Sequence, residues 1–299
     1  METESIAAGV AASSAYKILN QYTNGPIAMC EHRNELAMVY RDDRNDSFWL
    51  THSPDGINWY NAIQIENQQL YDVAAIASFK GHLYIVYKDD RNSRLWVTYG
   101  DWDSGANWKV YRLGEQLSDG PLCLVSNGRY LHLLYQDDKT VYKNWYTRTD
   151  DGTDWSKPVE VMQQQQMEDG GGNAAMAMLN GRLFVVYRDA SNDKMWSTHQ
   201  FSNGNFNTPA VITDQFTKGP ITLTFAHGAL YLVYADNTKS KIWVTKSTDG
   251  ERWSKPHELE NQQMKYAAGL AALERGISTQ VWLTYRDDRK TQLWSTRID

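Results

Sequence analysis

Six segments of this 299-residue chain repeat one set of side chains that could recognise a polyhydroxylated ligand. Each segment begins with a tyrosine, places an aspartate two residues later, and reaches a tryptophan nine or ten residues after the tyrosine. The first segment is YRDDRNDSFW, from Tyr40 to Trp49. Carboxylates can accept paired hydroxyl groups, arginine donates as a planar fork, and an indole ring covers the apolar face of a pyranose. The pattern therefore favours repeated sugar-binding sites.

The candidate carbohydrate-binding residues are the equivalent positions of the six copies. The tyrosines are Tyr40, Tyr87, Tyr135, Tyr187, Tyr234 and Tyr285, and the aspartates are Asp42, Asp89, Asp137, Asp189, Asp236 and Asp287. The tryptophans are Trp49, Trp96, Trp145, Trp196, Trp243 and Trp294. The basic residues are Arg41, Arg44, Lys88, Arg91, Arg188, Arg286 and Arg289. The acidic and basic set is complete only in copies one, two and six, so we expect some of the other sites to be weak or lost.

Each copy lies in a longer unit that predicts four short strands. In the second unit these are AAIASF, HLYIVY, RLWVTY and NWKVYRL, and the first turn is Lys80-Gly81. Asn127-Gly128 and Asn180-Gly181 occupy the same turn elsewhere and favour a type I′ hairpin. Four-stranded units repeated every 47 to 51 residues are typical of a propeller. We therefore expect an all-β fold, a six-bladed β-propeller of four-stranded blades.

The two ends of the chain predict how this ring closes. The last copy stops at Asp299, just after its third strand, whereas residues 15–21 resemble a fourth strand and its exit. We expect the N-terminal strand to complete the last blade, which removes an exposed sheet edge. Residues 1–299 then form a single domain. The expected blades, called repeats 1 to 6 below, span about 22–69, 70–116, 117–166, 167–215, 216–263, and 264–299 plus 1–21.

In this topology the loops between second and third strands share one face with the linkers between repeats, and we call that surface the rim. The linkers repeat a glutamine, so Gln21, Gln69 and Gln116 join the candidate contacts. Structural roles stay open for these positions. A glutamine can tie neighbouring blades together, an aspartate can cap its own loop, and a basic residue can form a solvated ion pair. The tryptophans can be wedged between blades.

The opposite face carries the turns between third and fourth strands, and three of them share a motif. They read SPDGINW, TDDGTDW and STDGERW, centred on Asp55, Asp151 and Asp249. Such an aspartate can accept backbone N–H groups, the following glycine can take a positive φ, and the tryptophan can pack between sheets. These residues favour a folded turn rather than a binding site.

With its repeats laid out, the chain resembles the sugar-binding β-propeller lectins of fungi and bacteria, and the SPDGINW-type turns resemble the Asp-box of sialidase-type propellers. The resemblance covers the whole chain and implies a multivalent agglutinin without catalytic residues. It also implies glycans or glycoconjugates as partners, with one site per blade or blade interface. Fucose-binding members use an arginine and a glutamate in the third strand, where this chain has FWLT and LWVT. The fucose site is therefore not carried over.

Two other function classes stay open. A sialidase-like glycosidase would share the Asp-box and needs an arginine triad, but Arg41, Arg188 and Arg286 occupy one repeat position instead of converging as unequal groups. A protein-interaction scaffold would be expected to have unequal rims selected for one partner. We expect a lectin, not an enzyme.

Composition narrows the remaining classes. The net charge of -6 argues against nucleic-acid and anionic-membrane partners, and no apolar run reaches the length of a membrane span. Glu2 and Glu4 stand where a signal peptide would be positive, and only two cysteines occur. We therefore expect no signal peptide and a cytoplasmic or non-classically secreted protein. No cofactor or metal is expected, and a homo-oligomer is compatible with the sequence.

Overall fold

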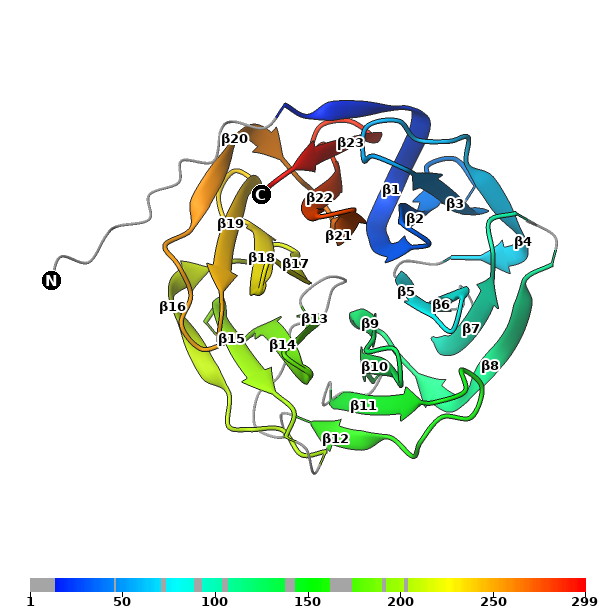
Figure 1. Cartoon of the computed structure of the whole chain (residues 1–299), viewed down its shortest axis with the longest axis horizontal. Helices are drawn as coiled ribbons and strands as arrows, with labels where there is room; N and C mark the ends of the chain where they lie inside the picture. The colour runs from blue at the N-terminus through cyan, green and yellow to red at the C-terminus, as the bar shows by residue number, and fades with distance from the viewer. Residues whose placement is uncertain are drawn as a thin grey trace, which may run out of the picture.

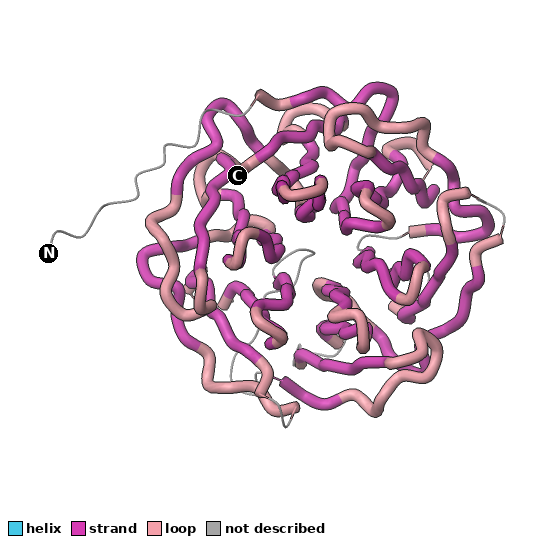
Figure 2. Tube along the Cα trace, viewed as in Figure 1, coloured by secondary structure: helices cyan, strands magenta, loops and turns pink. Residues whose placement is uncertain are grey.

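The computed structural model describes residues 14–45, 47–70, 74–88, 93–103, 107–137, 143–161, 174–189, 192–201 and 204–299, with the side chains of residues 66, 67 and 69 excepted. Within these ranges the secondary structure is entirely β, in 23 strands joined by turns and loops (Figure 2). No helix in this part of the chain has the length and apolar character to cross a membrane.

The described strands form four antiparallel sheets of four strands and one sheet of seven. The first four-stranded sheet contains β5 (Ala74–Phe79), β6 (His82–Lys88), β7 (Arg94–Gly100) and β8 (Lys109–Leu117). The second contains β9 (Leu122–Ser126), β10 (Leu131–Gln136), β11 (Asn144–Thr149) and β12 (Val159–Val161). The third contains β13 (Ala174–Leu179), β14 (Arg182–Arg188), β15 (Lys194–His199) and β16 (Ala210–Phe216). The fourth contains β17 (Ile221–Ala226), β18 (Ala229–Ala235), β19 (Lys241–Ser247) and β20 (His257–Gln263). The predicted four-stranded unit is confirmed in these four sheets.

The seven-stranded sheet joins the two ends of the chain. Its order is β21 (Gly269–Arg275), β22 (Ser278–Arg286), β23 (Gln292–Arg297), β1 (Tyr16–His32), β2 (Glu35–Asp42), β3 (Ser47–Ser53) and β4 (Ile63–Gln69). The first half of β1 pairs with β23, through Tyr16 with Ser295 and Lys17 with Trp294. Its second half pairs with β2. The predicted closure by the N-terminal strand is thus confirmed.

The sheets stand around a central axis like the blades of a propeller (Figure 1). The innermost strands surround a channel with a volume of about 110 Å³. Apolar side chains line it, among them Ile27, Ala75, Leu122, Met176 and Leu270. The fold is an all-β propeller with an apolar centre.

The hydrophobic core lies between neighbouring repeats rather than at one centre. Among the described residues, six buried clusters each combine side chains of two successive repeats. In one, Val86 and Leu95 pack with Leu131 and Leu133. Because strands inside the ring are covered on both faces, their sequences are apolar on both faces, as the sequence predicts.

Two of the predicted hairpin turns have the expected backbone. Lys80-Gly81 has φ values of 48° and 82°, and Asn180-Gly181 has 50° and 75°, as a type I′ turn requires. The turn at Asn127-Gly128 differs, because only Gly128 has a positive φ. There the Asn127 side chain accepts the backbone N–H of Tyr130 at 2.7 Å. An asparagine that caps its own turn replaces the type I′ geometry.

Candidate functional site

The six repeated tyrosines are core residues. Their exposed fractions lie between 0 and 5 %, and each faces the tryptophan of its own repeat across two strands, as Tyr40 faces Trp49. Burial raises the hydroxyl pKa of Tyr40 and Tyr234, with the nearby aspartates contributing. The prediction that Tyr40, Tyr87, Tyr135, Tyr187, Tyr234 and Tyr285 contact a ligand is corrected here, because their rings fill the space between repeats.

The six tryptophans are half-buried, and each packs on the core cluster that joins its repeat to the preceding one. Trp145 donates its indole N–H to Asp137 Oδ2 at 3.2 Å. The indole nitrogens of Trp49, Trp96 and Trp196 are buried without a hydrogen-bond partner. Each ring is therefore wedged between repeats while part of it stays exposed beside the rim.

The repeated aspartates organise their own loops. Asp42 Oδ1 accepts the backbone N–H of Arg44 at 2.9 Å, and Asp287 Oδ1 accepts that of Arg289 at 3.0 Å. Asp236 Oδ1 accepts three such bonds, at 3.1, 2.8 and 3.4 Å. Burial acts to raise the pKa of Asp236, but these N–H donors outweigh it and lower the pKa. One oxygen of each of these carboxylates is thus engaged by its loop. Asp89 lies outside the described residues.

Asp137 and Asp189 have comparable local contacts. Asp137 Oδ1 accepts the backbone N–H of Lys143 at 3.1 Å, and Asp189 Oδ2 accepts the side-chain amide of Asn192 at 3.1 Å. The loop-capping alternative therefore holds for every repeated aspartate that the structure describes. A ligand would meet preorganised loops rather than free carboxylates.

The basic residues next to the tyrosines reach toward the linkers. Lys88 Nζ lies 2.8 Å from Asp119 Oδ1, and Arg286 Nε donates to Thr23 O at 3.0 Å. Arg188 Nη1 lies 3.3 Å from Asp193 Oδ1. These contacts bury Arg188 and Arg286 almost completely.

The other predicted basic residues differ in exposure. Arg44 and Arg289 point into solvent, with side chains 81 and 79 % exposed, and Arg41 is half-buried. Arg91 lies outside the described residues.

The linker glutamine ties neighbouring repeats together. Gln21 Nε2 donates to Thr51 Oγ1 at 3.2 Å and to Tyr60 O at 3.0 Å. Gln68 and Gln215 donate in the same way to Thr98 and Thr245. The predicted ligand contact of Gln21 is corrected to this buried structural bond.

The two other predicted glutamines fare differently. In the second linker the inter-repeat bond belongs to Gln68 rather than to Gln69, whose side chain lies outside the described part. Gln116 is half-buried beside Gly114, and its Oε1 is buried without a partner. It stays a prediction as a ligand contact.

Three linkers contribute a group of residues that the predicted site lacks, which we call Ser/Thr-x-Gly-Pro hooks: residues 23–26, 118–121 and 217–220. Gly25 N donates to Thr23 Oγ1 at 3.1 Å, and Gly219 N donates to Thr217 Oγ1 at 2.8 Å. The middle residue faces the rim, as shown by Asn24, which donates to Asp43 O at 2.9 Å. The recurring Gly-Pro pair is the sequence signal that could have revealed this element.

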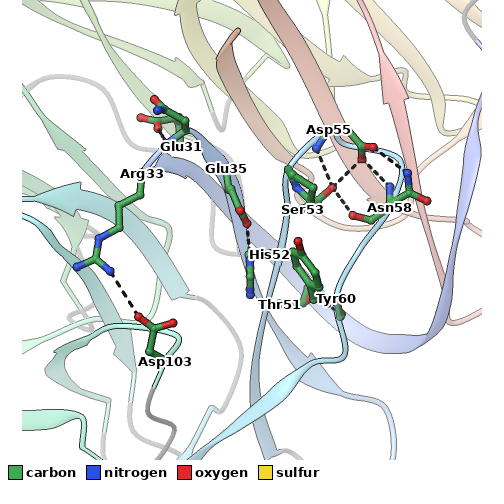
Figure 3. Close-up of polar contacts among 12 residues, drawn as sticks. Glu31, Arg33, Glu35, Thr51, His52, Ser53, Asp55, Asn58, Tyr60 and Asp103 are labelled. Carbon is green, nitrogen blue, oxygen red and sulfur yellow. Dashed lines mark hydrogen bonds and ion pairs between the residues drawn. The ribbon is translucent and has the colours of Figure 1, made fainter.

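On the opposite face the predicted turns have the expected hydrogen bonds (Figure 3). Asp55 Oδ1 accepts the N–H groups of Ile57 at 2.9 Å and Asn58 at 2.7 Å, and Ser53 Oγ accepts that of Gly56 at 2.9 Å. The turns at Asp151 and Asp249 repeat this pattern. Their backbone N–H donors hold the pKa of both carboxyls well below the usual range.

A second polar group on that face joins repeats 1 and 2. His52 Nδ1 lies 2.5 Å from Glu35 Oε2, and the His52 ring stacks on Trp102 at 4.4 Å. Figure 3 shows His52 between Glu35 and Tyr60, with Arg33 turned toward Asp103. Across the described ranges no group of three or more His, Cys, Asp or Glu residues could hold a metal ion.

Comparison with known proteins shows the fold. No protein-family model and no curated protein sequence matches the chain. A triple arginine-to-alanine mutant of AofleA from Arthrobotrys oligospora superposes with a TM-score of 0.71 at 12 % identity, covering 94 % of this chain and 85 % of that one. The fucose-specific lectin from Aleuria aurantia gives 0.66 at 10 %, covering 96 and 92 %.

An enzyme is also among the similar structures. The Hadza microbial sialidase Hz136 gives a TM-score of 0.66 at 12 % identity, and the match covers 92 % of this chain but 65 % of the sialidase. At such identities the likeness concerns the fold alone. The chain therefore shares its β-propeller architecture with fucose-binding lectins and with sialidases.

Proposed function

We propose that this protein is a multivalent lectin that binds terminal residues of glycans at repeated rim sites between blades. One observation carries the proposal. In every repeat a half-exposed tryptophan stands at a junction between repeats, and the aspartates described at the start of the neighbouring rim loops hold these loops by hydrogen bonds. An exposed indole edge next to fixed donors and acceptors suits a pyranose. The lectins among the similar structures support the assignment.

We further propose that the propeller has six blades. The seven-stranded sheet counts as two blades because β1 serves both, as the outer strand beside β23 and as the inner strand beside β2. The six inter-repeat clusters support this count. A similar structure, the Aleuria aurantia lectin, is described as a six-bladed β-propeller. The turns at Asp55, Asp151 and Asp249 then represent the Asp-boxes of blades 1, 3 and 5.

The glycosidase alternative has less support. A sialidase-like site would need unequal titratable groups at one place. The side chains that line the described channel are apolar apart from Thr222. The three arginines that could form a triad belong to repeats 1, 4 and 6. Arg188 ends β14 beside Asp193, whereas Arg286 ends β22 and contacts Thr23. We expect no release of fluorophore from a fluorogenic sialoside, and saturable turnover would replace the lectin assignment by the enzyme.

A glycan array tests the proposed function. The labelled protein should bind a restricted set of glycans that share one terminal residue, and the free monosaccharide should compete. Trp145→Ala, which removes an indole from one junction, should weaken binding to the array. Ile277→Ala is the control, because Ile277 is fully exposed in the turn between β21 and β22, on the face opposite the rim. Absence of binding to every glycan, with the fold intact by circular dichroism, would refute the proposal.

A further inference from the structure

The five junctions whose linkers the structure describes at the hook position fall into two classes. The linkers that join repeat 6 to 1, repeat 2 to 3 and repeat 4 to 5 carry the Ser/Thr-x-Gly-Pro hooks. The linkers that join repeat 1 to 2 and repeat 5 to 6 have an apolar side chain at the position of the hook's Ser or Thr. Leu70 and Met264 occupy that position and are both 1 % exposed. Met264 and Thr217 are structurally equivalent, because the backbone N–H of each donates to a carbonyl of the preceding rim loop. Met264 N donates to Ser240 O, and Thr217 N donates to Asp193 O.

The basic residues follow the same division. The residue after the repeated tyrosine is a cation in each even repeat: Lys88, Arg188 and Arg286. Lys88 contacts the hook residue Asp119, and Arg286 contacts the hook residue Thr23. Arg188 contacts Asp193, which Lys218 of the third hook approaches at 3.6 Å. All three hook junctions therefore contain a cation.

The odd repeats do not supply a comparable set to the other junctions. Their equivalent residues are Arg41, Gln136 and Ala235. Gln136 and Ala235 are buried beneath the hook of their own repeat. A β-carbon on Gly120 would lie 2.2 Å from Gln136 Oε1, and one on Gly219 would lie 2.8 Å from Ala235 Cβ. The residue after the tyrosine is thus a cation in each repeat that precedes a hook junction. In the three repeats that precede the other junctions, it is a cation only in repeat 1, as Arg41.

The opposite face shows the same threefold pattern independently. Gly56, Gly152 and Gly250 belong to the turns of odd repeats, and each packs against an aromatic ring of the preceding even repeat: Trp282, Tyr84 and Phe184. Their carbonyls also accept hydroxyl groups from that repeat, for example Ser197 Oγ to Gly250 O at 2.8 Å. Each even repeat and the odd repeat after it are therefore joined on both faces.

We propose that the ring is built from three two-repeat modules and has three ligand sites, one at each hook junction, instead of six. This inference rests on the proposed lectin function. Each site combines the even-repeat cation, the polar hook and the odd-repeat tryptophan: Arg286 with Trp49, Lys88 with Trp145, and Arg188 with Trp243. The hook provides donors and acceptors for sugar hydroxyls, the largely buried cation beneath it holds the junction in place, and the indole covers the apolar ring face. The occupant is one terminal sugar residue per junction.

The number of sites per chain tests this inference. The folded full-length protein is titrated by calorimetry with methyl α-L-fucoside, with N-acetylglucosamine, and with the methyl glycoside of any other terminal residue selected by the array. We expect a stoichiometry of three. A value of five or six, or of one, would overturn the inference while leaving the lectin function in place. No binding to any sugar or array glycan would refute the lectin function itself.

Single variants then locate the sites. Lys88→Ala and Arg188→Ala should each reduce the stoichiometry from three to two without changing the affinity of the remaining sites, and Arg188→Lys should restore the third. Arg129→Ala, an exposed cation on the opposite face, is the control and should keep three. Lys88 has the less buried side chain of the two, so its variant keeps the test valid if Arg188→Ala unfolds. A stoichiometry of three in both alanine variants would contradict the proposed sites.

Discussion

A β-carbon added to Gly152 would stand 2.2 Å from the hydroxyl oxygen of Tyr84, in the preceding repeat. The carbonyl of the same glycine accepts the Tyr111 hydroxyl at 2.6 Å, and the hydroxyl oxygen of Tyr111 accepts the indole N–H of Trp155 at 2.9 Å. A tight turn and two tyrosines thus fit together at one junction. The turn motif is therefore a contact surface between repeats as well as a local fold.

This contact predicts that Gly152→Ala strongly destabilises the protein. The new methyl group meets the Tyr84 ring, and Gly152 has a φ of +87°, which disfavours any β-carbon. Overpacking and strain together should reduce the free energy of unfolding by roughly 3 kcal/mol. Gly128→Ala is the matched control, because Gly128 has a φ of +82° but no atom within 4 Å of the added carbon. Equal losses in urea unfolding of the two variants would contradict the packing role.

The ring closure predicts a contrast between two adjacent residues of β1. Ile18 is 1 % exposed and packs in the cluster that joins repeats 6 and 1, whereas Leu19 is 70 % exposed. Ile18→Ala should cost about 3 kcal/mol of stability, within the usual range for a buried aliphatic side chain. Leu19→Ala should change stability by about 0.5 kcal/mol or less. Thermal unfolding of both variants checks this, and similar midpoints would argue against closure by the N-terminal strand.

The buried glutamine bond predicts that Gln21→Ala loses stability rather than only ligand binding. The change removes two hydrogen bonds of the buried amide, after which Thr51 Oγ1 and Tyr60 O keep their bond to each other at 2.7 Å. Each lost bond should cost about 0.5–1.5 kcal/mol. Gln64→Ala, at an exposed glutamine bonded to Ser47, should have little effect. Chemical denaturation compares the two. An unaltered midpoint for Gln21→Ala would return this residue to the list of ligand contacts.

His132 predicts part of the acid sensitivity of the fold. Burial, assisted by Arg148, lowers the pKa of His132 from 6.5 to about 4. Between these values the unfolded chain binds a proton that the folded chain does not. The free energy of unfolding should therefore be fully retained above pH 6.5 and should fall as the pH drops toward 4, by up to ~3 kcal/mol.

The variant His132→Gln isolates this contribution. Glutamine keeps an acceptor for the Tyr146 hydroxyl, which lies 2.7 Å from His132 Nδ1, but cannot titrate. Urea unfolding at pH 7 and pH 4.5 should show a smaller pH dependence for the variant than for the wild type. Parallel losses in the two proteins would show that other groups carry the acid sensitivity.

The sequence predicted the repeat, the four-stranded unit and the pairing of the two ends, because these depend on patterns that local chemistry imposes. It placed the tyrosines at the surface wrongly. In a strand that is apolar on both faces, polar and apolar residues do not alternate. The sequence therefore does not show on which face of the sheet the last aromatic side chain lies. Tyr40 lies near the end of such a strand, β2, where it is buried opposite Trp49.

The linker glutamine shows a second limit. Gln68 and Gln69 are adjacent, and the outer strand pairs irregularly, because Ser47 opposes Gln69 while Trp49 opposes Gln64. A bulge of this kind changes which residue faces inward, so counting along the sequence cannot choose between neighbours. The contacts of Asp119 and Asp193 with basic residues of the even repeats were also beyond sequence reasoning, since they depend on how separate loops approach each other.

The continuous strand β1 has a consequence for how the protein is made. Its first half is synthesised before the other described strands, yet its hydrogen-bond partners lie on β23, which follows all of them. During translation the first half of β1 therefore has to wait, unpaired, until the repeats between these two strands have emerged. Contacts between such distant positions form slowly, so we expect the pairing of β1 with β23 to complete the ring late in folding.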